Sequence, residues 1–153
     1  MEKFTTSVAS VASGNDKTLI NIFNPAATPT NRTRIYYLSI GSVATPADQA
    51  ANFSLGRTTA VGTEGSGLTP ANVDPAGPAG ACDSGLGVFS VEPTYTAGKT
   101  LLMVPLNQRA TFQWYANPQG ELILAATQNN GPGLKTASST STQAHTSTIM
   151  FEE

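Results

Sequence analysis

The pattern of apolar and polar residues along the chain predicts mostly β-strands. Residues 34–40 (RIYYLSI) are rich in β-branched and aromatic side chains and are closed by Gly41, which makes them one of the clearest predicted strands. Residues 53–58 (FSLGRT) alternate with the period of two that is typical of a half-buried strand. Similar signals predict further strands at 4–11, 17–23, 87–91, 121–125 and about 144–151.

Two segments in the second half of the chain allow more specific predictions. Residues 100–106 (TLLMVPL) form a nearly continuous apolar run, which predicts a strand buried on both faces, with Pro105 placing its end at a sheet edge. Residues 109–116 alternate so that Phe112 and Trp114 face the core together. The sequence NPQG at 117–120 predicts a type I turn that joins this strand to a hairpin partner at 121–125, and 129–133 predicts another turn.

One short helix and one long excursion complete the predicted organisation. Thr45 is a suitable N-cap, Pro46 fits the first helical position and Asp48 lies near the positive end of the helix dipole, so we expect about two helical turns before Asn52. Residues 60–87 are rich in Gly and Pro and predict an extended loop or arm, with a short extended piece at 68–73.

These elements predict one all-β domain over residues 1–153. Nine or ten short strands, one small helix and turns rich in Gly, Pro and Asn are typical of a β-sandwich or a jelly roll. Strands that pair across long loops favour the jelly roll. A chain of this length can bury a sizeable core.

The composition indicates a surface with little charge. Charged residues make up 12% of the chain, about half of the usual share, while 39% of the residues are hydrophobic. The surface must therefore be filled with Thr, Ser, Ala, Asn and Gln, which lose little hydration energy when another protein covers them. This favours a subunit of an assembly, and the alternative is a secreted β-domain of low charge.

Charge and cysteine content narrow the possible partners and compartment. The net charge is −2 and the eight Lys and Arg residues are spread singly along the chain, which argues against binding to nucleic acid. No run of 18 apolar residues exists, so we expect no membrane partner. The N-terminus lacks the apolar region of a signal peptide and Cys82 is a single cysteine; both favour folding in a cytoplasm, where the sequons at Asn31 and Asn52 stay unglycosylated.

No recognisable enzyme site is present, so we expect no catalytic residue, cofactor or metal. His145 is the only histidine and has no assignable nucleophile, acid or set of zinc ligands, which predicts a surface or interface residue. Cys82 has no neighbouring His or second Cys and is predicted to be a buried or incidental thiol. Glu64, Asp74 and Asp83 leave a calcium site as an alternative, although the EF-hand spacing is absent.

Two further groups of residues allow a ligand-binding or a structural interpretation. A phosphate-binding loop requires glycines between a strand and the start of a helix. Gly62, Gly65 and Gly67 lack that context, so we expect no phosphate-binding loop. Trp114 and Tyr115 suggest a sugar-binding platform if both face solvent, but a single Trp in an alternating strand is more commonly a core residue.

Short motifs spread over most of the chain form a moderately specific set. Within residues 34–67 they include ATPAD at 44–48 and RTTAVGT at 57–63, followed by TP at 69–70, DPA at 74–76, EPTYT at 92–96, PLNQRATFQW at 105–114, NNGPGL at 129–134 and FEE at 151–153. As a set these resemble small virion-associated proteins of tailed bacteriophages. The resemblance implies a capsid decoration (cement) protein, a class that often uses β-sandwich or jelly-roll domains as trimers on the head lattice. It fixes no functional residue.

We therefore expect a homo-oligomer, with a trimer favoured, that is made in the host cytoplasm and binds the major capsid protein on the outer surface of a phage head. The excursion at 60–87 and the N-terminal segment are expected to contact neighbouring subunits, because Leu68, Val73 and Leu86 are apolar residues that a free loop does not need. The alternatives are a tail or neck component of the virion and a carbohydrate-binding β-sandwich in which Trp114 and Tyr115 face solvent.

Overall fold

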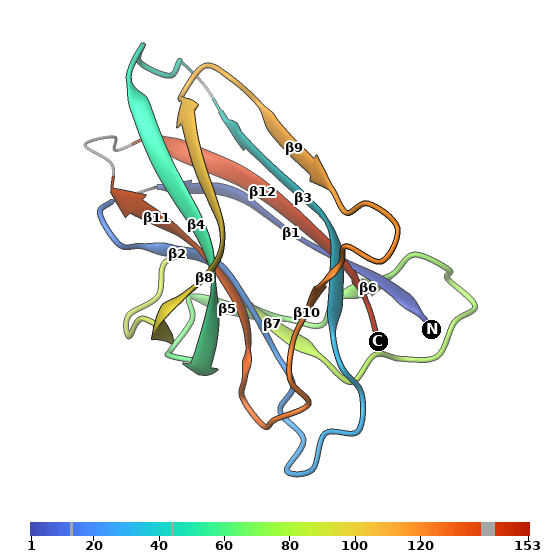
Figure 1. Ribbon diagram of the computed structural model, residues 1–153. Coiled ribbons are helices and arrows are strands. Elements are labelled where there is room, and N and C mark those ends of the chain that lie inside the picture. Colours follow the sequence, from blue (N-terminus) through green and yellow to red (C-terminus); the bar gives the residue numbers. More distant parts are fainter. Residues whose placement is uncertain (13, 44, 139–142) are drawn as a thin grey trace.

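The computed structural model describes residues 1–12, 14–43, 45–138 and 143–153, with the side chains of residues 10–12 and 138 left out (Figure 1). The described residues form twelve strands and no helix, and so no helix that could cross a membrane. The strands are β1 (Lys3–Ala12), β2 (Thr18–Phe23), β3 (Arg34–Ser42), β4 (Ala50–Ala60), β5 (Ser66–Leu68), β6 (Ala71–Asn72), β7 (Asp83–Leu86), β8 (Thr94–Asn107), β9 (Phe112–Tyr115), β10 (Leu122–Ile123), β11 (Gly131–Ser138) and β12 (Ala144–Glu152).

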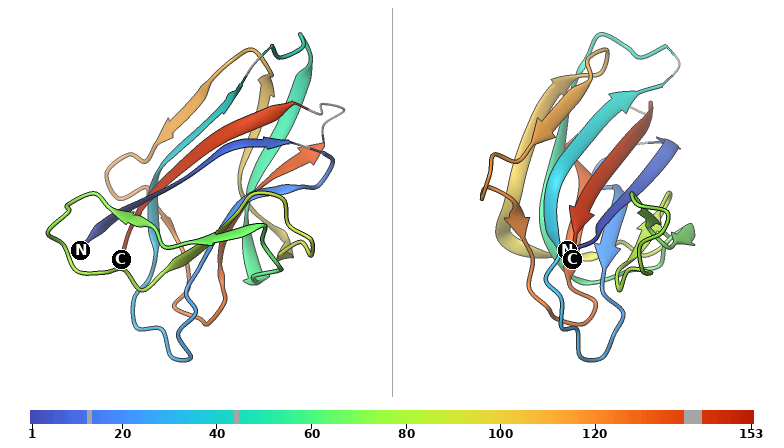
Figure 2. Two further views of the ribbon diagram at one scale, coloured as in Figure 1. Left: turned by 180° about the vertical axis from the view of Figure 1, so that it is seen from behind. Right: turned by 90° about the vertical axis from the view of Figure 1, so that its right-hand side faces the viewer.

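The strands form two six-stranded antiparallel sheets, which agrees with the predicted all-β, β-sandwich-like architecture. Sheet A has the order β10-β3-β12-β1-β6, with β9 also paired to β3, and sheet B has the order β5-β7-β2-β11-β4-β8. One set of pairings is nested along the chain: β1 with β12, β2 with β11, β3 with β9 and β10, and β4 with β8. The two sheets face each other in Figure 2, where the N- and C-terminal ends lie side by side.

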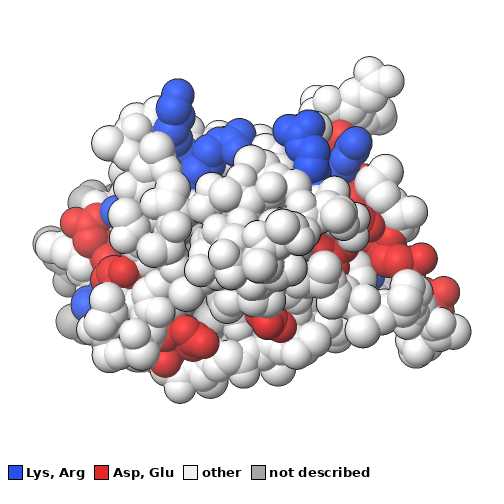
Figure 3. Space-filling model, turned by 90° about the horizontal axis from the view of Figure 1, so that it is seen from below, with Lys and Arg blue, Asp and Glu red and all other residues white. Residues whose placement is uncertain are grey.

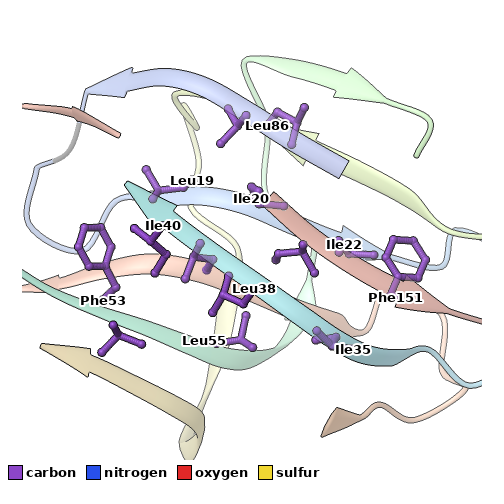
Figure 4. Packing of buried hydrophobic residues seen from close by; sticks show 14 of the residues in the cluster. Leu19, Ile20, Ile22, Ile35, Leu38, Ile40, Phe53, Leu55, Leu86 and Phe151 are labelled. Carbon is purple, nitrogen blue, oxygen red and sulfur yellow. The ribbon is translucent and has the colours of Figure 1, made fainter. Parts of the chain in front are cut away.

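The core lies between the two sheets and follows the alternation of the strands. In β12 the buried positions are His145, Ser147, Ile149 and Phe151, while the residues between them are only half-buried. Figure 4 shows how side chains of the two sheets interdigitate; the large side chains with almost no exposure are Phe4, Leu19, Ile20, Ile22, Ile35, Leu38, Ile40, Phe53, Leu55, Leu134, Ile149 and Phe151. This packing is the main source of stability, because each such side chain contributes roughly 1.5–3 kcal/mol when it leaves water.

The prediction that residues 100–106 form a strand buried on both faces is wrong. This segment belongs to β8, the last strand of sheet B, and of its residues only Val104 is buried. Leu101, Leu102 and Leu106 are partly buried against the core, and Met103 is exposed. The reason is that an apolar run does not reveal whether another layer covers its second face. Pro105 does lie on an edge strand, as predicted, where a missing N–H is tolerated.

The short helix predicted at 45–52 is not formed. Ala50 and Ala51 instead begin β4 and pair with Asn107 and Leu106 of β8. The Asp48 carboxylate accepts a hydrogen bond of 2.6 Å from Asn107 and lies 3.9 Å from the Arg109 guanidinium. A helix of two turns is marginal without tertiary support, because its nucleation cost is spread over few hydrogen bonds, so pairing with β8 prevails.

The excursion at 60–87 has more regular structure than predicted. β5 and β7 extend sheet B beyond β2, and β6 extends sheet A beyond β1. Cys82, Ser84 and Leu86 are buried, so the end of the excursion belongs to the core. The strand predicted at 87–91 is displaced to 83–86, since the positive φ of 86° at Gly87 ends β7.

The turns also differ in detail from the prediction. The Gly120 N–H donates to the Asn117 carbonyl at 2.7 Å, but Gln119 has a φ of 66°, which belongs to a type II rather than a type I turn. The following β10 does not pair with β9 as a hairpin; both strands pair with successive parts of β3.

The turn predicted at 129–133 ends earlier than expected, because Gly131 already begins β11. A Cβ atom at Gly131 would overlap the Ile22 carbonyl, so close packing of β11 on β2 requires glycine there.

Phe112 and Trp114 share the inward face of β9 and pack against the core, as predicted, although both remain partly exposed. Tyr115 points the other way and is 65% exposed. We predict that Trp114→Ala lowers the free energy of unfolding by about 2–3 kcal/mol, less than for a fully buried aromatic side chain. Tyr115→Ala is the matched control and should cost about 1 kcal/mol or less, through lost ring contact with Tyr37. Urea unfolding measures both, and equal losses would contradict the assigned faces.

Candidate interaction surface

Exposed apolar side chains concentrate along the excursion and the segment after it. Of the seven large hydrophobic residues that are exposed in the described chain, four lie between residues 68 and 91: Leu68, Val73, Val88 and Val91. Val88 is 63% exposed and Val91 is 59% exposed, so neither contributes much to the fold. We call Leu68, Val88 and Val91 the excursion edge. Leu68 lies on β5, and the two valines lie on the segment that packs beside residues 62–65, just before β5.

Backbone hydrogen bonds hold the excursion edge in place. The Thr63 N–H donates to the Val91 carbonyl at 2.8 Å, and the Ser90 N–H donates to the Thr63 carbonyl at 2.9 Å. Gly62 allows this approach: its φ is 74°, and a Cβ there would lie within 3 Å of the backbone of residues 91–93. The exposed apolar side chains therefore project from an ordered backbone, and little conformational entropy remains to be lost when a partner binds.

β5 closes sheet B at this side and leaves a strand edge. All three of its residues are exposed, and its one neighbouring strand is β7. The Ser84 hydroxyl donates to the Leu68 carbonyl at 2.7 Å and shares a 2.9 Å hydrogen bond with Thr6 of sheet A. Ser84 thus ties the edge to both sheets, and the outward N–H and C=O groups of β5 are positioned for another strand.

A shallow hollow of about 240 Å³ lies beside the excursion edge. Glu64 and Asp83 contribute carboxylates to it, while Phe23 and Leu68 contribute apolar walls. The surface therefore combines a few acidic groups with exposed aliphatic side chains, as is typical of the mixed interior and rim of a protein interface.

The excursion also contacts the N-terminal and C-terminal ends of the chain. β6 pairs with β1 at Phe4 and Thr5, and the Val73 N–H donates to the Lys3 carbonyl at 2.9 Å. The Glu153 carboxylate accepts a hydrogen bond of 2.6 Å from the Ala81 N–H. Figure 2 shows the excursion running past both termini. The N-terminal segment and the excursion consequently form one continuous region of the surface.

His145 is buried, which corrects the prediction of a surface or interface residue. Its side chain is 1% exposed, shares a hydrogen bond of 3.1 Å with the Ser42 hydroxyl through Nδ1, and lies edge-on to Phe53. Burial lowers the pKa of His145, and a backbone hydrogen bond with Gly41 opposes this in part. In the part of the chain that the structure describes, no carboxylate bonds to its ring, so no orienting acid completes a catalytic arrangement.

Cys82 is buried, as predicted, and is chemically quiet. Its Sγ lies 3.2 Å from the Thr33 hydroxyl, and burial raises the pKa of the thiol to about 12. The thiolate, which is the nucleophilic form, is therefore scarcely populated at neutral pH.

Among the acidic and glycine residues considered as ligand sites, Asp74 and Gly62 have structural roles. Across the described ranges no three His, Cys, Asp or Glu residues gather into a metal-binding group. Asp74 caps its own turn, where its carboxylate accepts a hydrogen bond of 2.9 Å from the Ala76 N–H. Trp114 and Tyr115 lie on opposite faces of β9 and do not form a joint sugar-binding platform.

Comparison with models of known protein families, with curated proteins and with solved structures found no match to this chain. The excursion edge is therefore defined by its geometry alone: exposed aliphatic side chains, a hydrogen-bonded backbone and, at β5, an open strand edge. Sequence reasoning placed apolar residues in the excursion, but it missed Val88 and Val91, which it assigned to a strand.

We predict that the stability of the fold decreases as the pH falls below about 6.5, the usual pKa of an unfolded histidine. Because the pKa of His145 is lower in the folded state, the unfolded state binds more protons below that pH and gains at most about 1.4 kcal/mol per pH unit. Urea unfolding of wild type and His145→Gln between pH 7.5 and pH 5 measures this. The difference between the two proteins should shrink toward low pH; a constant difference would contradict the assignment.

Cys82 should resist thiol reagents in the folded protein. A pKa of about 12 and 2% exposure predict that Ellman's reagent at pH 8 reacts at least a hundredfold more slowly with native protein than with protein in denaturant. Comparable rates in the two states would show that Cys82 opens readily to solvent.

Proposed function

We propose that this protein is a structural component of a tailed-bacteriophage virion, a decoration protein that binds the outer surface of the head. The observation that carries the proposal is the excursion edge, which presents three exposed aliphatic side chains, one on β5 and two on the hydrogen-bonded segment 88–91, in a chain with only 12% charged residues. Free monomers usually avoid such surfaces, because charge is their main protection against association. The sequence motifs that resemble virion-associated proteins point to the same class.

We further propose that the domain is a jelly roll. If the three strands of the excursion are set aside, the remaining pairings follow a long hairpin wound on itself, in which β1 pairs with β12, β2 with β11, β3 with β9 and β10, and β4 with β8. The ladders of β12 with β3 and of β11 with β4 then join these pairs into two sheets. Such domains occur in viral capsids and also in lectins, so the topology supports a capsid role without deciding it.

The mechanism of stabilisation is burial of the excursion edge against the major capsid protein. A ligand that binds only the assembled head raises the free energy needed to separate the capsid subunits, in proportion to the logarithm of its concentration over its Kd. A single copy of the edge is small for a stable interface, which usually buries about 800 Å² per partner. A homo-oligomer, with a trimer favoured, multiplies the contacts and raises the avidity.

The test uses purified protein and heads that lack it, assembled from the capsid genes of the same genome. We expect wild type to saturate discrete positions on the head and Val88→Ser/Val91→Ser to lose at least tenfold in affinity. Met103→Ser is the matched control, since Met103 is 52% exposed on β8, at the opposite end of sheet B. Cosedimentation measures affinity, cryo-electron microscopy locates the bound protein, and thermal unfolding confirms that all variants fold.

Point substitutions test the surface more cleanly than deletion of residues 62–80. That deletion also removes β6 from β1 and the Leu68 carbonyl from Ser84, so a loss of binding would not separate contact from folding. If Val88→Ser/Val91→Ser binds heads as well as Met103→Ser and wild type do, the excursion edge is not the contact surface. If wild-type protein binds isolated tails or necks and not heads, the decoration role is wrong and the tail alternative is supported.

A further inference from the structure

Three basic residues that form no salt bridge in the described structure lie around one short strand. In the described structure the salt bridges use Lys17, Arg109 and Lys135, and Lys3 lies over the Tyr36 ring. Arg32, Arg34 and Arg57 belong to none of these ion pairs. Each of the three contacts or pairs with β10 or with Leu124, the residue that follows it. Figure 3 shows Lys and Arg gathered along one rim of this end of the molecule, with Asp and Glu at the flanks and below.

Backbone carbonyls, and not carboxylates, position the guanidinium groups. Nη2 of Arg57 donates to the Ile123 carbonyl at 3.1 Å, and Nε of Arg32 donates to the next carbonyl, that of Leu124, at 3.4 Å. Arg34 is opposite Ile123 in the ladder of β3 with β10, and opposite Glu152 in the ladder with β12, but it forms no ion pair with Glu152 in the described structure. The guanidinium groups of Arg32 and Arg57 are therefore held by carbonyls, and neither belongs to a salt bridge in the described structure.

Arg57 connects the two sheets at the end of the sandwich where β10 lies. It extends from β4 of sheet B, in line with the buried Phe53 and Leu55, and reaches β10 at the edge of sheet A. A guanidinium has five N–H donors, and one bond to a carbonyl fixes its orientation while leaving several donors for a ligand. Its position is pre-organised, which lowers the entropic cost of binding.

A small hollow opens beside this arginine. Its volume is about 100 Å³, and Arg57, Thr59, Thr96 and Asn130 supply its polar lining, without any Asp or Glu. The Thr58 hydroxyl donates toward Asn21 Oδ1 at 2.9 Å and lies 3.1 Å from the Gly131 carbonyl, which fixes the wall behind the hollow. The hollow is far smaller than pockets for drug-sized ligands, which measure about 300–1,000 Å³.

We propose that this hollow binds one oxyanion group, a carboxylate, a phosphate or a sulfate, with Arg57 as the main binding residue. The forked donors of a guanidinium match two oxygens of such a group, and the hydroxyl and amide groups of the lining supply further donors. Arg32 and Arg34 add positive potential that attracts anions to the mouth. A cation is disfavoured, because no carboxylate lines the hollow. This site does not depend on the proposed role in the virion.

The test titrates the full chain with sodium phosphate, sodium sulfate and sodium acetate at constant ionic strength, followed by amide chemical shifts. We expect saturable shifts at Thr59, Thr96 and Asn130, and at least a tenfold loss of affinity in Arg57→Gln. Arg109→Gln removes the same charge near Asp48, away from the hollow, and should bind as wild type does. Arg57→Lys keeps the net charge but lacks the fork, so it should also bind at least fivefold more weakly.

The anions distinguish the source of the ligand group. Tighter binding of phosphate and sulfate than of acetate identifies a phosphorylated or sulfated ligand, and the reverse order identifies a carboxylate; either result supports the proposal. Shifts that do not saturate, or equal affinities in wild type, Arg57→Gln and Arg57→Lys, overturn it. In that case Arg57 only ties the two sheets together. If Arg57→Gln fails to fold, the comparison of anion affinity between wild type and Arg57→Lys still tests the proposal.

Discussion

The burial of β2 on both faces is the constraint on which much of the structure depends. Residues 18–22 are all buried, and β2 lies between β11 and β7. Asn21 is a polar residue in this buried strand, so its amide needs partners. It accepts from the Thr58 hydroxyl at 2.9 Å and lies 3.4 Å from the Val61 carbonyl through Nδ2. These bonds hold the start of the excursion, and the pairing of β7 with β2 holds its end. Both ends of the excursion are therefore fixed to β2. Because β7 pairs with β2 and β5 pairs with β7, β5 becomes the edge strand of sheet B.

Tyr95 fixes the outer face of the same sheet. Its hydroxyl shares a 3.0 Å hydrogen bond with Thr18, and the Lys135 ammonium lies 4.8 Å from the centre of its ring. Burial raises the pKa of Tyr95 well above its usual value, so the phenol stays protonated and can donate. Gly56 and Gly133 leave room for the ring, since a Cβ on either would press on it. Small residues in two central strands thus allow the first part of β8 to lie close against the sheet.

The sequence was a good guide to strands and a poor guide to their neighbours. Alternation predicted the strand at 34–40 and the shared face of Phe112 and Trp114, because side-chain direction is a local property of the chain. Apart from the edge indicated by Pro105, it assigned burial on both faces to the wrong strand, to 100–106 instead of 18–22, since long-range pairing decides which strand is covered. The burial of His145 had a usable signal, because His145, Ser147, Ile149 and Phe151 share one face of β12. The short helix failed for the opposite reason: its local signals were real, but pairing with β8 outweighed them.

The position of Arg57 depends both on the local alternation of side chains along β4 and on the long-range pairing of strands. Alternation with Phe53 and Leu55 directs its side chain toward the space between the sheets, which the sequence alone could have indicated. Only the fold brings it to β10, 66 residues farther along the chain. The strand order separates Arg57 from β5, because β7, β2 and β11 lie between β5 and β4. In sheet A, β10 and β6 are at opposite ends. The hollow and the excursion edge are formed by different residues, so each proposal can fail without the other.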